Sequence, residues 1–149
     1  MFTPKTILVP TDFSRSSDMA LEKALDLAQE YHSKVILLHV IDEHIQQCAA
    51  DYCLRSEDIQ RLEEESALRS REMLEKEASS LKGSRQVEID FDLRMGAPAD
   101  VILSEQKRTG SDLIVIGSHG RKGIRKHLIG GVTDKVVRGA ITPVMVVHT

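Results

Sequence analysis

The chain has 149 residues, a length that suits one domain, and we expect a single domain over residues 1–149. Its formal net charge is −3 and only 3% of its residues are aromatic. Neither a broad basic surface nor a base-stacking surface for nucleic acid is expected from such a composition. The N-terminus lacks the pattern of a signal peptide, and no apolar run approaches the ~20 residues of a membrane span. We therefore expect a soluble, cytoplasmic protein with no nucleic-acid or membrane partner.

The first part of the chain contains two apolar runs with a helical pattern between them. Lys5–Val9 is a β-rich apolar run ended by Pro10, and Val35–Ile41 is a second such run. Both are predicted to be strands that are buried on both faces of a parallel sheet. Between them, apolar residues recur at helical spacing over Ser17–Tyr31. Two serines can cap this helix: Ser14 and Ser16.

Residues 42–55 show no clean periodicity and are predicted to be a surface excursion. They contain His44, Cys48 and Cys53, whose spacing matches no zinc pattern and which lack a fourth ligand. We therefore expect two free thiols there and no metal site.

A long polar helix is predicted from Ser56 to about Leu81. Its apolar spacing covers fewer than four heptads, which favours an amphipathic helix that packs on the core over a coiled coil. Its expected core side consists of Ile59, Leu62, Ala67, Leu68, Met73, Leu74, Ala78 and Leu81.

The remaining elements continue the alternation of strands and helices. Gln86–Leu93 alternates polar and apolar residues, as is typical of a half-exposed edge strand. A helix is predicted over Pro98–Arg108, because proline suits the first helical turn. Leu113–Gly117 is a fully apolar strand, Thr133–Arg138 is a short helix, and Pro143–His148 is the last strand.

This order predicts an α/β fold, a doubly wound five-stranded parallel sheet with helices on both faces. Ligands of such sheets bind beyond the carboxyl ends of the strands, where the strand order reverses. Three segments follow strand ends: Pro10–Asp12, Val40–Asp42 and Gly117–Gly120. We therefore expect a ligand site among them.

Glycines flank a basic loop between the fourth strand and the last helix. Gly117 and Gly120 end the strand, and Gly130 precedes the helix. Free backbone N–H groups and the helix dipole at such a junction can hold an anion. The glycines can also be simple turn and cap residues, and Asp12 can be a turn carboxylate. The basic loop, which either screens a bound phosphate or is only solvated, contains Arg121, Lys122, Arg125, Lys126 and His127.

Over its whole length the chain resembles a single-domain universal stress protein. The resemblance is carried by ILVPTDFS, LLHVID, GAPADVIL, LIVIGSHGR and TPVMVVHT. The family has a nucleotide-binding pattern of Gly, two residues, Gly, nine residues, Gly, then Ser or Thr. Gly117, Gly120 and Gly130 meet this spacing, but Gly131 replaces the hydroxyl residue. Some members of the family lack the glycine pattern and do not bind ATP.

The resemblance implies a Rossmann-like, adenine nucleotide α-hydrolase-like fold and an ATP-binding, homodimeric stress-response module. The implied dimer forms through Pro143–His148. A magnesium ion would bridge the phosphates with few protein ligands, and Thr133 would partly replace the hydroxyl missing at Gly131. The implied nucleotide-binding residues are Pro10, Thr11, Asp12, Val40, Gly117, Ser118, His119, Gly120, Arg121, Gly130, Gly131, Val132 and Thr133.

Two other functions stay open. The first is a dimeric scaffold that has lost the phosphate site through Gly131. The second is a weak nucleotide hydrolase or phosphotransferase that uses the basic loop and His119. The chain has no Walker-type lysine motif and no evident base to orient water, so any ATP hydrolysis is expected to be slow. No GxGxxG follows the first strand, which disfavours a dinucleotide-dependent oxidoreductase.

Overall fold

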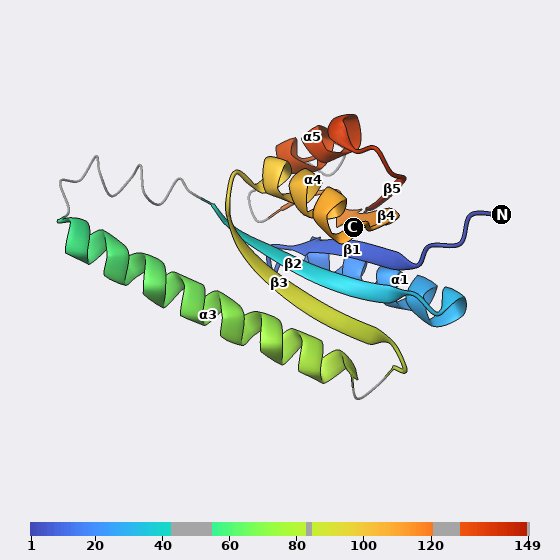
Figure 1. The fold of residues 1–149 in the computed structure, drawn as a ribbon, viewed down its shortest axis with the longest axis horizontal. Helices are drawn as coiled ribbons and strands as arrows, with labels where there is room; N and C mark the ends of the chain where they lie inside the picture. Colours follow the sequence, from blue (N-terminus) through green and yellow to red (C-terminus); the bar gives the residue numbers. More distant parts are fainter. Residues whose placement is uncertain (43–54, 83–84, 121–128, 149) are drawn as a thin grey trace.

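The computed structural model describes residues 1–42, 55–82, 85–120 and 129–148, which form a five-stranded sheet with helices against it (Figure 1). The strands are β1 (Thr6–Thr11), β2 (Lys34–Asp42), β3 (Glu88–Gly96), β4 (Leu113–Gly117) and β5 (Val144–Val147). The helices are α1 (Arg15–Tyr31), α3 (Ser56–Lys82), α4 (Pro98–Thr109) and α5 (Gly131–Gly139). Every strand pair is parallel and the order is β3-β2-β1-β4-β5. The predicted doubly wound parallel sheet is therefore confirmed.

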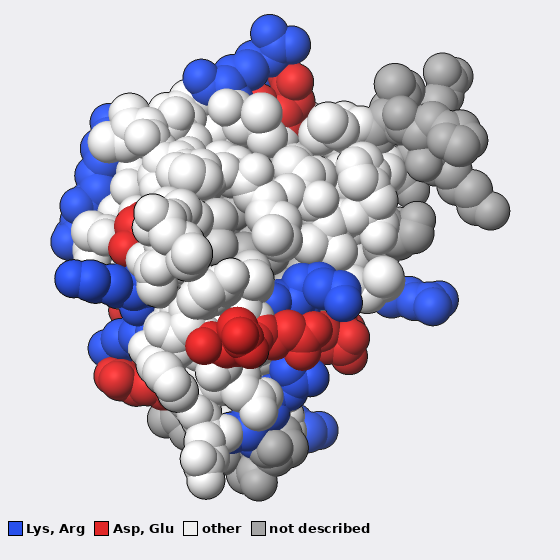
Figure 2. All heavy atoms as spheres, turned by 90° about the vertical axis from the view of Figure 1, so that its right-hand side faces the viewer, with Lys and Arg blue, Asp and Glu red and all other residues white. Residues whose placement is uncertain are grey.

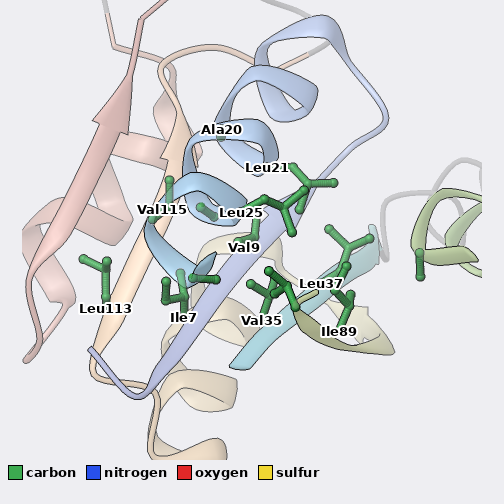
Figure 3. Packing of buried hydrophobic residues seen from close by; sticks show 14 of the residues in the cluster. Ile7, Val9, Ala20, Leu21, Leu25, Val35, Leu37, Ile89, Leu113 and Val115 are labelled. Carbon is green, nitrogen blue, oxygen red and sulfur yellow. The ribbon is translucent and has the colours of Figure 1, made fainter. Parts of the chain in front are cut away.

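Successive residues of the central strands fill two separate cores. Ile7 and Val9 of β1 point to the side of α1 and α3, where they pack with Leu25 (Figure 3). Leu8 points to the opposite side and packs in the cluster that contains Ile102 of α4. Because both faces of the sheet are covered by helices, successive residues in the middle of these strands are apolar, as in Ile7–Val9 and Val35–Leu38. This arrangement explains the uninterrupted apolar runs in the sequence.

β1 is longer than its sequence pattern predicts. The strand was expected to end at Val9, but it continues through Pro10 to Thr11. After Leu8, β1 pairs with β2 but no longer with β4. Pro10, which has no backbone N–H, therefore interrupts no pairing with β4. The two extra residues carry the chain directly to the edge where the strands end.

β3 is the predicted edge strand, but it lies later in the chain than expected. It pairs with β2 residue for residue, from Lys34 opposite Glu88 to Asp42 opposite Gly96. The end of β3 is therefore set by the length of β2 rather than by its own alternation, which the sequence showed only to Leu93.

On the side of the molecule where the N-terminus lies, basic and acidic side chains stand beside one another (Figure 2). The structure contains ion pairs between Lys34 and Glu88 at 3.1 Å and between Arg108 and Asp92 at 2.7 Å.

Only the C-terminal part of α3 packs on the sheet. Leu74 and Ala78 are buried in the core on the α1 side, and the polar Ser70 is buried one turn earlier. The expected core side is wrong at three positions, which are exposed: Leu62, Leu68 and Met73. At 3.6 residues per turn these three lie off the stripe that passes through residues 70, 74 and 78. The helix packs on the core as an amphipathic helix, through a narrower stripe than its apolar residues suggested.

Candidate functional site

The strand order reverses between β1 and β4, and a cavity of about 500 Å³ opens at their carboxyl ends. Its walls come from the β1–α1 turn, the ends of β2 and β4, and the first turns of α4 and α5. Eleven predicted site residues line it: Pro10, Thr11, Asp12, Val40, Gly117, His119, Gly120, Gly130, Gly131, Val132 and Thr133. Ser118 is fully buried and is not among the lining residues. Arg121, the rest of the basic loop and the two cysteines lie outside the described residues.

The β1–α1 turn holds the Asp12 carboxylate at the cavity wall. Asp12 Oδ1 accepts a hydrogen bond from the Ser14 N–H at 3.1 Å, and Thr11 Oγ1 accepts one from the Phe13 N–H at 3.0 Å. Phe13 adopts a positive φ of 60°, which an ordinary residue rarely does. Ser14 then caps α1 by accepting from the Ser17 N–H. Asp12 is therefore a turn carboxylate and a cavity-lining group at the same time.

Gly117 allows α1 to approach the end of β4 closely. A Cβ at this position would lie 2.5 Å from Ser16 Oγ and 2.8 Å from the Ser16 carbonyl carbon and oxygen. Ser16 Oγ also accepts a hydrogen bond from the His119 N–H at 3.4 Å. The first glycine of the pattern is thus required by packing of the backbone, whatever the cavity holds.

The first turn of α5 faces the cavity with its backbone N–H groups. Gly130 caps the helix, and its N–H donates to the Ser118 carbonyl at 2.7 Å. Gly131, Val132 and Thr133 follow, and N–H groups in a first helical turn have no partner within the helix. Together with the helix dipole they form a site suited to an anion.

The side chain of Thr133 does not replace the hydroxyl missing at Gly131. Thr133 is buried, and its Oγ1 donates a hydrogen bond to the Gly117 carbonyl at 2.8 Å. A phosphate oxygen only accepts hydrogen bonds, and the one hydroxyl hydrogen of Thr133 is already in use. A Cβ added at Gly131 would meet no atom within 4 Å, so a larger residue fits there. The expected compensation by Thr133 is therefore wrong.

Carboxyl groups on α1 and α3 lie near the β1–α1 turn. Burial raises the pKa of Asp18, and the Asp12 and Glu22 carboxylates raise it further. Burial also raises the pKa of Glu77 to about 7, with a smaller contribution from Asp18. In the described ranges no three His, Cys, Asp or Glu side chains are arranged as a metal site.

The sequence profile of the universal stress protein family matches residues 3–148. The chain belongs to this family. In the described part of this family member, no helix combines the length and apolar character needed to cross a membrane.

Known universal stress proteins are similar to the chain along its whole length. Universal stress protein MJ0577 of Methanocaldococcus jannaschii is 29% identical, with 96% of this chain and 94% of that protein covered. Universal stress protein A homolog 2 of Coxiella burnetii is 34% identical, with 97% and 94% covered. The solved MJ0577 structure superposes with a TM-score of 0.86 over 99% of this chain and 98% of its own. A universal stress protein in complex with cAMP shares the fold, with 24% identity, a TM-score of 0.66 and coverage of 99% and 98%.

Sequence reasoning missed the wall of the cavity on the α4 side. Leu38 and Ile116 lie on the same face of the sheet as Val40, and Pro98 and Ile102 of α4 lie opposite them. Ser17 and Asp42 also line the cavity. The alternation of faces along β2 and β4 could have identified the strand residues, because Leu38 is two residues from Val40. The α4 residues needed the three-dimensional arrangement.

Proposed function

We propose that the protein is an adenine-nucleotide-binding universal stress protein, with ATP as its ligand, that acts as a homodimeric regulatory module. One observation carries the proposal. A single cavity joins an apolar slot to the N-terminal turn of α5, at the place in the sheet where nucleotides bind in doubly wound folds. Its volume of about 500 Å³ suits a small organic ligand.

The two ends of the cavity differ in chemistry, as the two ends of a nucleotide do. Leu38, Val40, Ile102 and Ile116 give the slot apolar walls that suit a base. The N–H groups of the first turn of α5 suit the phosphates. Asp12, at the wall formed by the β1–α1 turn, has a carboxylate that can accept hydrogen bonds from ribose hydroxyls.

Solved structures of the fold add support for an adenine nucleotide as the ligand. One universal stress protein was solved in complex with cAMP, and one from Archaeoglobus fulgidus was solved in complex with dAMP. For the present chain, ATP with a magnesium ion bridging the phosphates is the proposed ligand. The described cavity residues offer few ligands for the metal, so magnesium would be held mainly by phosphates and water.

Regulation fits the cavity better than efficient catalysis does. The N–H groups at the start of α5 would position phosphates. Rapid hydrolysis also requires a group that orients and activates water. We therefore propose slow ATP hydrolysis at most, with binding as the functional event.

The proposed dimer forms through the free edge of β5 and residues 143–148. Large apolar side chains are exposed close to this edge in sequence: Val137, Ile141 and Met145. Pairing with the same strand of a second copy would cover them and satisfy the edge. Ile141, 77% exposed, offers the sharpest test. The Ile141→Glu variant should lower the mass measured by light scattering from that of a dimer to that of a monomer.

A competing function is a dimeric scaffold without nucleotide, which the glycine at position 131 and the engaged Thr133 hydroxyl favour. Calorimetric titration of nucleotide-stripped protein with ATP and magnesium separates the two functions. The Gly131→Ser variant adds a hydroxyl in open space, and Gly131→Ala is the matched control that adds only the Cβ.

We expect micromolar binding by the native chain. The serine variant should bind roughly ten- to a hundredfold more tightly, because a hydrogen bond to a charged group contributes about 1.5–3 kcal/mol. The alanine variant should match the native chain. Binding by the serine variant alone would mean a silenced pocket and would favour the scaffold. Absence of binding by all three proteins would contradict the nucleotide proposal.

A further inference from the structure

We propose that the His119 imidazole binds a phosphate oxygen of the ligand through its Nε2–H group, and that Ser118 is the positioning residue for this ring. The inference rests on the proposed nucleotide function and assigns one side chain to the phosphate end of the same cavity. It starts from a buried polar atom that has no partner in the described part of the chain.

That atom is His119 Nε2. It is shielded from solvent and has no hydrogen-bond partner among the described residues, although His119 lines the cavity. Buried side-chain nitrogens are hydrogen-bonded in the large majority of cases, because an unpaired one costs about 1–3 kcal/mol. An unpaired nitrogen at the wall of a ligand cavity is explained if the ligand supplies the partner.

The ring is anchored from behind by Ser118. Ser118 Oγ lies 2.8 Å from His119 Nδ1, and Ser118 itself is fully buried. The backbone of Ser118 is held on both sides, because its N–H donates to the Val147 carbonyl at 2.8 Å and its carbonyl accepts from the Gly130 N–H at 2.7 Å. A side chain fixed in this way gives the imidazole one orientation rather than several.

The serine hydroxyl can either donate to Nδ1 or accept from it, so the contact permits the tautomer that an anionic ligand needs. When the serine hydroxyl donates to Nδ1, the proton of the neutral ring is on Nε2, which becomes a donor. Phosphate oxygens accept hydrogen bonds and cannot donate them at neutral pH, so this tautomer matches an anionic ligand. The opposite tautomer would place a lone pair of Nε2 against the phosphate charge.

The position of His119 identifies the phosphate end rather than the base end. A Cβ added at Gly130 would lie 3.6 Å from His119 Cα and 3.4 Å from the Ser118 carbonyl oxygen. The backbone of His119 is therefore next to the residue that caps α5, whose first turn supplies the other anion donors. The apolar slot lined by Leu38 and Ile102 contributes no such group.

Two amide substitutions separate the two ring nitrogens. In His119→Asn the amide reaches only the position of Nδ1, so the contact with Ser118 can persist while the Nε2 donor is lost. In His119→Gln the amide nitrogen reaches the position of Nε2. Titration calorimetry with ATP should show about a tenfold loss of affinity for the asparagine variant and about a threefold loss or less for the glutamine variant.

Adenosine is the matched probe, because it has the base and ribose but no phosphate. Both variants should bind adenosine as the native chain does. ATP affinity that survives His119→Asn would overturn the inference, and so would an equal loss for adenosine. Absence of ATP binding by the native chain would instead contradict the proposed function, and the inference with it.

To test whether Ser118 positions the His119 ring, the tautomer of that ring must be measured. A purely structural role of Ser118 would leave the tautomer unchanged. In the ATP complex, nitrogen NMR of the labelled His119 ring should show the tautomer with its proton on Nε2. In Ser118→Ala, the unliganded ring should show a mixture of tautomers, and ATP affinity should fall several-fold with no change in adenosine affinity. A ring in the native ATP complex with its proton on Nδ1 would overturn the assignment.

Discussion

The amino and carboxyl ends of the central strands β1 and β4 differ in whether their polar groups have hydrogen-bond partners within the protein. At the amino end, the Asp112 carboxylate accepts hydrogen bonds from the Lys5 and Thr6 N–H groups at 3.0–3.1 Å, and the Thr142 hydroxyl donates to the Asp112 carbonyl at 2.6 Å. At the carboxyl end, His119 Nε2 has no hydrogen-bond partner in the described part of the chain, and the first turn of α5 has N–H groups that the helix itself does not pair. The polar groups at the amino end are paired within the protein, whereas those at the carboxyl end are available to a ligand.

β1 and β4 are the neighbouring strands at which the strand order reverses. Polar groups at their amino ends contribute to the stability of the fold, whereas polar groups at their carboxyl ends are available to bind a ligand. Donors satisfied within the chain stabilise the fold and have nothing left to offer a ligand. Donors left unsatisfied cost stability until a ligand binds. Substitutions at the two ends should therefore have different effects on folding and on nucleotide affinity.

Gly117→Ala should have the largest effect on folding, because the new Cβ would lie 2.5–2.8 Å from Ser16 atoms, including its backbone. We expect a loss of about 3 kcal/mol in the free energy of unfolding, measured with urea, because α1 must move away from β4. Gly131→Ala is the matched control, since its Cβ meets no atom within 4 Å. Equal stability of the two variants would mean that the close approach of α1 to β4 is not required.

Asp112→Ala should destabilise the fold without changing the cavity at the other end. It removes the acceptor of two backbone N–H groups, and we expect a loss of about 1–2 kcal/mol in the free energy of unfolding. Asp112→Asn keeps an acceptor oxygen and should lose less. ATP affinity, measured at a temperature where both variants are folded, should match that of the native chain. A parallel loss of affinity would show that the two ends are not independent.

Glu77→Gln should have a smaller effect, visible as a change in pH dependence. In the folded chain Glu77 keeps its proton up to about pH 7, whereas its ordinary pKa is 4.5. Between these values the folded state binds more protons than the unfolded state, so this group lowers stability as pH rises from about 4.5 to 7. In the glutamine variant the free energy of unfolding should not show this decrease with pH. At pH 8 the variant should therefore be the more stable protein, by about 1 kcal/mol or less because Glu77 is partly exposed.

Thermal denaturation of the native chain and of Glu77→Gln across pH 4–8 measures this difference. Glu75→Gln is a suitable control, because Glu75 is an exposed carboxylate on the same helix. A constant difference between native chain and Glu77→Gln over the whole range would rule out the raised pKa as its cause.

The fold and most of the cavity were predictable because they depend on local patterns. Apolar runs, helical spacing and the positions of Gly117 and Gly130 lie within short windows of sequence. The features that were missed depend on contacts between distant segments. The length of β3 is set by its pairing with β2, and the wall contributed by Ile102 depends on how α4 crosses the sheet.

The hydrogen bonds that individual side chains already make within the fold could not be predicted from the sequence. Thr133 looked available for a ligand, but its hydroxyl donates to the Gly117 carbonyl. Ser118 looked like a site residue, but it is fully buried and contacts His119 instead. A pattern identifies which residue types are present, whereas the structure determines which of their hydrogen bonds are already made.

The central place of β1 also has a consequence for synthesis on the ribosome. β1 forms one wall of the cavity, but its neighbour β4 follows roughly 100 residues later, and α5 later still. At about 5–20 residues per second, the early strand waits roughly 5–20 s for its second partner. During that time β1 can pair with β2 alone, so one of its edges stays open. A nucleotide can therefore assist folding only after nearly the whole chain has been made.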